Sequence, residues 1–543
     1  MGVDSISHLL IDSLLALVVC GWLLLTGIGA LRLLTSRFQG LQLVCYGVGV
    51  GILANGLVGL IVAAVGWQPR LVAAVLLSAS TIGSLWIWSR RRIVQELRAS
   101  LGWMDRTAVL AWVAFACLCV GITHLNIQFP PVLFDGPYVF KNHRLHVKIQ
   151  TMTGHLPADN YIPYVVCEFL LRGISFKAER PLCPGQEVSN RTVLMALAAV
   201  PWRAVVEPPP RQEGPLGTFE YAGTQWPDVE QLGKDKYFRQ FLVVGIVLNA
   251  ALLLGASLLF KNHSSDKLLG IGILLLVSNP YVISQTIFTW PKALAAFFIL
   301  LAIDAFVREK SPVLGAFFLA LAYHSHPYAI VFAASFGLYL ICQALGRRAL
   351  WKDAVLYIVV FALLVAPWFV WTRVVLRIPS EMMQQNFQWG NSLDSVWVRI
   401  HNLYELFSFR QLEAFPFHRD EFVQTSLICF PGMVGMIFVL PGYLGLVKFF
   451  SQQRFLILFA VLAPTIVVVS IFGYIAAVPA LHGMQAVTPI LMFLALKFML
   501  ESRARRMVWL LLVTQIVINL AMLAARAEVL GIFGPTTATS WLH

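Results

Sequence analysis

Apolar runs of about 20 residues recur along almost the whole chain, and no other sequence feature constrains the fold as strongly. A membrane-spanning helix needs such a run, because the hydrocarbon layer is about 30 Å thick and each helical residue rises about 1.5 Å. Of the 543 residues, 58% are hydrophobic and only 12% are charged, whereas soluble domains have about 25% charged residues. The sequence therefore predicts an all-α polytopic membrane protein in contact with a lipid bilayer.

The apolar runs number about fourteen, and we expect about 12–14 transmembrane helices because the segments near Phe298 and Phe318 are short. The approximate centres of all the segments are Ala16, Leu53, Ala79, Ala116, Leu248, Leu276, Phe298, Phe318, Ala334, Phe361, Met436, Val467, Phe493 and Val513.

Lysine and arginine concentrate in alternate connections between these segments, and such residues favour the cytoplasmic side. With the N-terminus outside, the short outside connections and the C-terminal tail hold only Arg70, Lys292 and Arg526. We therefore expect a multi-pass protein of the cell inner (plasma) membrane whose active site faces the periplasm or exterior. The formal net charge of +13 then reflects mainly cytoplasmic cations, so no nucleic-acid partner is expected.

Two long connections fall on the predicted outer side, and the first carries most of the unusual polar residues. It also holds Cys167 and Cys183; a structural disulfide between them is one alternative on an oxidising side of the membrane. We divide the chain into N-terminal transmembrane helices (1–106), a core (107–375) that includes outer loop 125–236, and a C-terminal part (376–543) with the second outer loop and the last helices.

The densest polar stretch begins at Asp135, where the predicted fourth helix emerges. A carboxylate at the edge of an apolar bundle loses hydration and becomes a better proton acceptor, which suits a general base. Alternatively, Asp135-Gly-Pro137 is a turn whose Asp caps the next helix. Tyr138 and the residues after it fit an amphipathic interfacial helix. His155 and Asp159 belong to the same stretch, but their spacing fits no defined metal site, so we expect no required metal and leave a divalent metal as an alternative.

Lys292 is one of the few cations in the short outer connections, directly after a helix break at Thr289-Trp-Pro-Lys292. A lysine near the bundle can neutralise a lipid-linked phosphate as a compact point charge. The competing interpretation is a side chain that snorkels to the lipid headgroups.

The next outer turn contains Tyr323-His-Ser-His-Pro-Tyr328. Because His324 and His326 are two positions apart, they face different ways on a helix, and only a turn would bring them together. The alternatives for these histidines are a structural capping role and metal binding, and either side chain could also bond a phosphate oxygen. Arg373 and Arg377, where the tenth predicted helix leaves the membrane, are further phosphate candidates.

Several short motifs occur in a characteristic order. Asp135-Gly-Pro-Tyr138 precedes Gly154-His-Leu-Pro157, then Asn279-Pro280 leads to Trp290-Pro-Lys292, and Gln485 lies in a segment that ends at Pro489. In their order and in their predicted position on the outer side of the membrane, these motifs resemble those of the GT-C superfamily of polyprenyl-phosphate-sugar glycosyltransferases, in particular protein O-mannosyltransferases and lipid A aminoarabinose transferases. Two positions depart from the family pattern: Gly136 replaces the second acid, and Gln485 stands near an expected arginine.

The resemblance implies a GT-C-like bundle with a large first outer loop and interfacial helices, and an inverting transfer of a hexosyl or pentosyl group. The donor would be a polyprenyl-phosphate-linked sugar, and the acceptor a hydroxyl of a glycan, lipid or protein. Asp135 would be the catalytic general base. The implied donor phosphate-binding residues are Lys292, His324, Arg373 and Arg377, and the implied substrate-binding residues are Tyr138, His155, Asp159, His326 and Gln485.

Two other function classes stay open at this stage. A lipid-linked polysaccharide polymerase or ligase would place its basic residues in later loops, where Arg399, Arg410 and Arg419 lie. A transporter or flippase of lipid-linked sugars would favour charges in mid-membrane helices and symmetric halves, and the sequence shows few such charges and no internal repeat.

Overall fold

The structure is a computed structural model, and the fold it shows is mostly helical. It describes residues 3–124, 162–177, 192–377, 444–471, 484–501 and 509–520, with short breaks within 192–377, 444–471 and 509–520. The sheet within these residues is a two-stranded antiparallel hairpin of β1 (Thr218–Tyr221) and β2 (Thr224–Pro227). The all-α prediction therefore holds apart from this hairpin.

Seven helical stretches among the described residues are long and apolar enough to cross a membrane. Each contains one of the predicted segment centres, which confirms the polytopic membrane character. They are α1 (Val3–Leu34), α2 (Gly40–Val65), α3 (Pro69–Arg90), α5 (Trp103–His124), α9 (Asp235–Ala250) continued by α10 (Leu252–His263), α15 (Ala329–Gly346), and α16 (Trp351–Phe369) continued by η6 (Val370–Val375).

The remaining predicted segments are helical but shorter where the structure describes them. Predicted centres fall in α11 (Asp266–Ser278), α13 (Lys292–Val307), α14 (Pro312–Ser325), α21 (Ala463–Ile471) and α23 (Met484–Leu500). Met436 lies outside the described residues, so the expected total stays a prediction. The other described helices are α4 (Ile93–Ser100), α7 (Ile162–Arg172), α8 (Leu194–Val206), α12 (Pro280–Ile287), α20 (Arg454–Ile457) and η8 (Leu458–Leu462).

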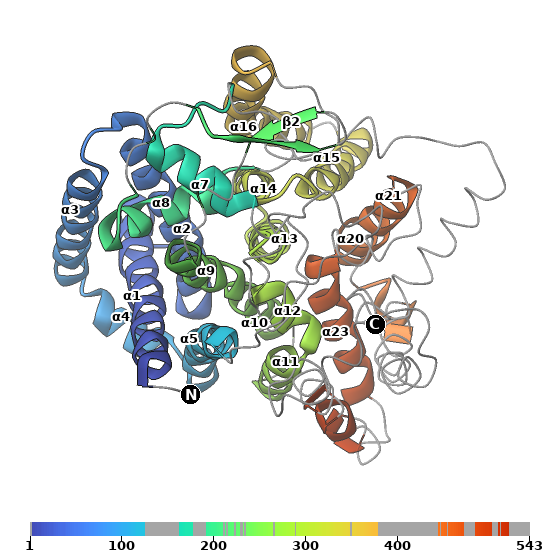
Figure 1. The fold of residues 1–543 in the computed structure, drawn as a ribbon. Helices are drawn as coiled ribbons and strands as arrows, with labels where there is room; N and C mark the ends of the chain where they lie inside the picture. Colours follow the sequence, from blue (N-terminus) through green and yellow to red (C-terminus); the bar gives the residue numbers. More distant parts are fainter. Residues whose placement is uncertain are drawn as a thin grey trace, which may run out of the picture.

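The core of the bundle lies around α9, α10 and α13. Figure 1 shows these helices between α1–α3 on one side and α20, α21 and α23 on the other. The apolar window of the α9–α10 stretch is 100% buried, as expected for a helix that is apolar all round. At the crossing of α1 and α2, a Cβ on Gly27 would lie 1.8 Å from the Gly47 carbonyl oxygen, so glycine permits this close packing.

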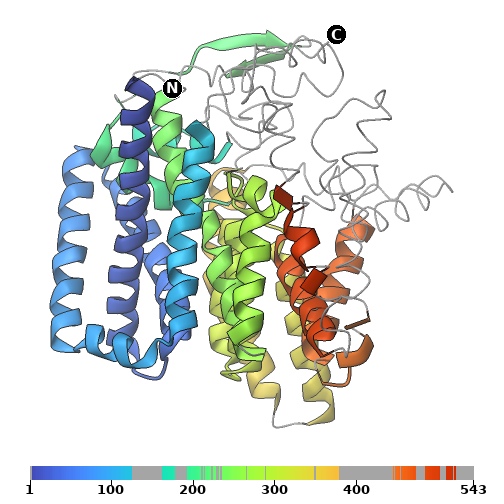
Figure 2. The same ribbon diagram turned by 90° about the horizontal axis from the view of Figure 1, so that it is seen from below.

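Polar contacts between distant segments define one end of the bundle, which we call the basic end: the ends of α1, α10 and α13 and the starts of α2 and α5. There Arg37 Nη2 lies 2.6 Å from Glu309 Oε2, and Lys261 pairs with Asp105. The opposite end, where α5 ends and α9 starts, is called the loop end. Figure 2 shows the helices running side by side between the two ends, with the hairpin beyond the loop end. This arrangement matches the predicted alternation of these helices, and which end faces the cytoplasm stays a prediction.

The predicted outer loop 125–236 contributes two helices that pack on the bundle. The Asn55 side chain of α2 donates a hydrogen bond to the Ala198 carbonyl of α8 at 2.7 Å. A Cβ on Gly59 would lie 1.9 Å from the Leu197 carbonyl oxygen. Because α8 is apolar but too short to span, it buries its side chains against α2 and α3. The loop is therefore partly built into the bundle.

Cys167 of α7 is a free thiol in the structure and is 0% exposed. Burial raises its pKa well above the usual value, so the thiol stays protonated and unreactive. The other cysteine of the disulfide considered from the sequence, Cys183, lies outside the described residues, so that pairing stays a prediction.

Candidate functional site

The start of α13 places Lys292 in the protein interior. Its side chain is 0% exposed, and Nζ lies 3.4 Å from the centroid of the Trp290 ring. An ammonium over an indole face is stabilised by the ring quadrupole. Pro291 caps α13 at its N-terminus and interrupts the preceding chain. The lysine therefore does not snorkel to the surface, which removes one of the two interpretations of its position.

Two residues of the turn after α14 complete a group around this lysine. His326, the C-cap residue of α14, is 1% exposed, and its ring centroid lies 5.4 Å from that of Trp290 and 5.1 Å from that of Tyr328. The Tyr328 hydroxyl donates to the Lys292 carbonyl at 3.0 Å. We call Trp290, Lys292, His326 and Tyr328 the Lys292 cluster. Sequence reasoning singled out Lys292 and His326; Trp290 and Tyr328 were within the quoted motifs but had no assigned role.

Hydrogen bonds tie the start of α13 to three other helices. The Asn249 amide of α9 accepts a bond from the Leu294 backbone N–H at 3.2 Å and donates to the Gln285 carbonyl at 3.4 Å. Gln485, 1% exposed on α23, donates to the Gln285 side-chain oxygen at 2.9 Å. The chain of contacts links α23 through α12 and α9 to α13. Gln485 is thus connected to the region around the start of α13, where Lys292 lies.

Of the other predicted phosphate-binding residues, His324 has a described contact with a different helix. His324 Nε2 lies 2.9 Å from the Leu364 carbonyl oxygen of α16, whereas the His326 ring lies near those of Trp290 and Tyr328, so the two histidines have different partners. Arg373 is partly exposed in η6, and Arg377, two residues after the end of η6, is exposed with a φ of 55°. A joint phosphate site of these three residues with Lys292 stays a prediction.

The predicted general base and three predicted substrate-binding residues, Asp135, Tyr138, His155 and Asp159, lie outside the described residues. The chain leaves α5 at His124, so the segment that carries them begins at the loop end. Within the described part of the chain, no group of three or more His, Cys, Asp or Glu side chains could hold a metal ion.

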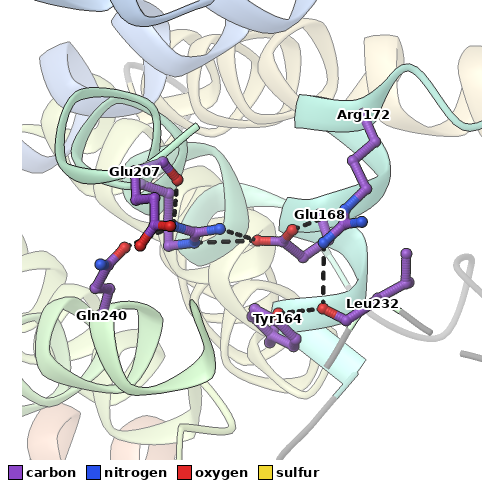
Figure 3. Close-up of polar contacts among 7 residues, drawn as sticks. Tyr164, Glu168, Arg172, Glu207, Leu232 and Gln240 are labelled. Carbon is purple, nitrogen blue, oxygen red and sulfur yellow. Dashed lines mark hydrogen bonds and ion pairs between the residues drawn. The ribbon is translucent and has the colours of Figure 1, made fainter. Parts of the chain in front are cut away.

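A second polar group, which sequence reasoning missed, lies between α7, α8 and α9 (Figure 3). Glu168 and Arg203 are each 0% exposed, and Arg203 Nη2 lies 2.7 Å from Glu168 Oε1. Arg172 Nε donates to Glu168 Oε2 at 3.0 Å. Arg203 also donates to Gln240 Oε1 at 2.6 Å and to the Glu207 carbonyl at 3.0 Å. We call this the Glu168 network. The sequence signal that could have revealed this network is Arg203 inside the apolar stretch of α8, because a buried arginine needs a buried partner.

A third polar group ties α1, α5 and α9 together at the loop end. Asp12 Oδ2 lies 2.8 Å from His124 Nε2 and 3.1 Å from Arg239 Nε. Arg239 Nη2 donates to His124 Nδ1 at 2.9 Å. Because Arg239 occupies Nδ1, the hydrogen-bond pattern assigns the ring proton to Nε2, where it bonds to Asp12. His124 is the last residue before the segment that contains Asp135, so this group fixes where that segment begins.

These arrangements suit different chemistry. The Glu168 network pairs one buried carboxylate with two arginines of the same chain. The Lys292 cluster instead combines a buried ammonium with the start of a helix, and both favour an anion. Searches for relatives return no matching family model, no matching curated protein and no matching solved structure.

Proposed function

We propose that this chain is an integral membrane glycosyltransferase of GT-C type that moves a sugar from a polyprenyl-phosphate donor to an acceptor hydroxyl. The observation that carries the proposal is the Lys292 cluster: a fully buried lysine at the first turn of α13, on the indole face of Trp290, whose ring also packs near that of His326. The order of the sequence motifs and the membrane-spanning helices support the same proposal.

The leaving group of such a transfer is a lipid phosphate, and it gains negative charge as the bond to the sugar breaks. Lys292 supplies a compact positive charge, and the N-terminus of the 16-residue α13 adds the positive end of its dipole. Burial strengthens both effects, because fewer water molecules screen the charges. A phosphate that is paired in this way leaves without taking up a proton.

The acceptor hydroxyl needs a base, and Asp135 is the proposed one. As the hydroxyl oxygen attacks the anomeric carbon, Asp135 takes its proton, and the carbon–oxygen bond to the phosphate breaks with its electron pair on the phosphate. Attack from the face opposite the leaving group inverts the anomeric configuration. In this proposal, Tyr138, His155, Asp159, His326 and Gln485 contact the substrates.

The test is a transfer assay on the full chain in vesicles, with a panel of polyprenyl-phosphate hexoses and pentoses and a membrane extract as acceptor source. Asp135→Asn should reduce transfer by about 10²- to 10⁴-fold, the usual contribution of a general base, and should keep binding to polyprenyl phosphate unchanged.

Asp353→Asn, the same chemical change at the first turn of α16, is the matched control and should transfer at the normal rate. Normal transfer by the Asp135→Asn variant would remove Asp135 as the base. No transfer from any donor by the unaltered protein would contradict the proposed function.

A further inference from the structure

A cavity of about 620 Å³ opens at the basic end, at the far end of the bundle from the Lys292 cluster. It lies where the start of α2, the end of α4, the start of α5 and the ends of α10 and α13 meet, and α4 lies across this lower end in Figure 2. Its volume is within the usual range for small-molecule sites, about 300–1,000 Å³. The lining residues that matter to its chemistry are Gln42, Ser100, Asp105, Lys261, Asp304 and Arg308.

Two carboxylates form the inner part of this lining. Asp105 is 1% exposed and Asp304 is 7% exposed. Asp105 pairs with Lys261, and Asp304 Oδ2 accepts hydrogen bonds from Tyr46 at 2.6 Å and from Gln42 at 2.9 Å. The Ser100 hydroxyl oxygen is buried without a hydrogen-bond partner. The interior of the cavity therefore offers acceptor groups that favour a ligand with several N–H donors.

Two cations belong to the lining of the same cavity. Arg308 is exposed, and the Lys261 side chain is 34% exposed. Together they favour an anionic group at the entrance. A ligand that fits carries a positive group at one end and a phosphate a few bonds away.

We infer that this cavity binds the headgroup of an ethanolamine phospholipid, with its ammonium toward Asp304 and Asp105 and its phosphate toward Lys261 and Arg308. The cavity lies at the level where the spanning helices end, which is the level of lipid headgroups, and basic pockets between helices recognise such groups. The acyl chains stay in the bilayer. A choline headgroup has no N–H donors for the carboxylates, and a glycerol headgroup has no cation.

The test is lipid retention by the full chain. The protein is reconstituted with equal amounts of ethanolamine, choline and glycerol phospholipids of identical acyl chains, stripped with mild detergent and analysed by native mass spectrometry. We expect about tenfold more retained ethanolamine lipid than choline lipid, the size expected for one charge-assisted hydrogen bond. Equal retention of all three, or preferential retention of the glycerol lipid, would overturn the inference.

Two variants locate the bound lipid. Ser100→Leu places a larger side chain in the cavity and should reduce retained ethanolamine lipid about tenfold, whereas Ala99→Leu, at the exposed neighbouring position, should not. Asp304→Asn keeps an acceptor for Tyr46 and Gln42 but removes the charge, so it should abolish the preference over choline lipid. Because Asp304→Asn is a conservative change, it tests whether the ethanolamine lipid binds in this cavity even if Ser100→Leu does not fold. Unchanged selectivity in Asp304→Asn would overturn the assignment.

Discussion

Two buried cations near the loop end have very different surroundings. The Arg203 guanidinium contacts Glu168, Gln240 and the Glu207 carbonyl, so its charge and donors are used inside the protein. The Lys292 ammonium lies on the Trp290 ring, at the start of a helix. A planar guanidinium with fixed acceptors holds three helices together, whereas a compact ammonium at a helix start suits an incoming anion. Burial alone therefore does not identify a functional charge; the geometry around it does.

The largest expected effect is on the Glu168 network. Glu168→Gln leaves Arg172 and Arg203 buried without their shared counter-charge, and breaking a buried ion pair costs about 3–5 kcal/mol. We expect the free energy of unfolding in mixed micelles to fall by about that amount. The α7–α8 region should also become accessible to protease. A change below about 1 kcal/mol would show that this network does not hold the helices together.

Lys292→Ala distinguishes a ligand-binding cation from a structural one. We expect transfer from a polyprenyl-phosphate sugar to fall about 10²- to 10³-fold, the usual cost of removing one electrostatic contact to a leaving group. Lys292→Arg should recover part of the rate, because it keeps the charge but changes its shape.

The control for this experiment is Lys352→Ala, an exposed lysine at the start of α16, which should leave transfer unchanged. Binding of polyprenyl phosphate is measured in parallel. If Lys292→Ala transferred normally but unfolded at a much lower denaturant concentration, Lys292 would belong with Arg203 as a structural cation.

Asp12→Asn is expected to have an intermediate effect. The asparagine keeps an acceptor for His124 but loses the charge that faces Arg239, whose side chain is 34% exposed and therefore partly hydrated. We expect a loss of about 1–3 kcal/mol in the free energy of unfolding, measured as for Glu168→Gln. Thr123→Val, which removes a neighbouring hydroxyl on α5, is the control. A loss as large as that of Glu168→Gln would show that the partial hydration of Arg239 does not reduce the cost of removing its counter-charge.

The sequence predicted the parts of this fold that follow local rules. Apolar runs located the seven long helical stretches. Contacts between residues far apart in the chain left no local pattern. Glu168 meets Arg203 only because α8 packs beside α7, and the treatment of 125–236 as one outer loop concealed a helix too short to span. The clustering of Lys292 with His326 likewise depends on how the start of α13 and the end of α14 meet in space.

The smallest effect is expected at an ion pair on the surface, which sets the baseline for the buried groups. Lys448 Nζ lies 3.0 Å from Glu501 Oε2, and the two side chains are 46% and 43% exposed. Exposed pairs contribute about 0–1 kcal/mol, because water screens the charges and two long side chains lose freedom. Glu501→Gln should therefore change the free energy of unfolding by less than about 1 kcal/mol, and by less still at high salt. A salt-independent loss near that of Glu168→Gln would mean that this pair is shielded from water, by the bilayer or by another part of the chain. In that case, the exposed fraction of a side chain in the isolated chain would not be enough to classify its charge as surface or buried. The classification would have to include the surrounding membrane.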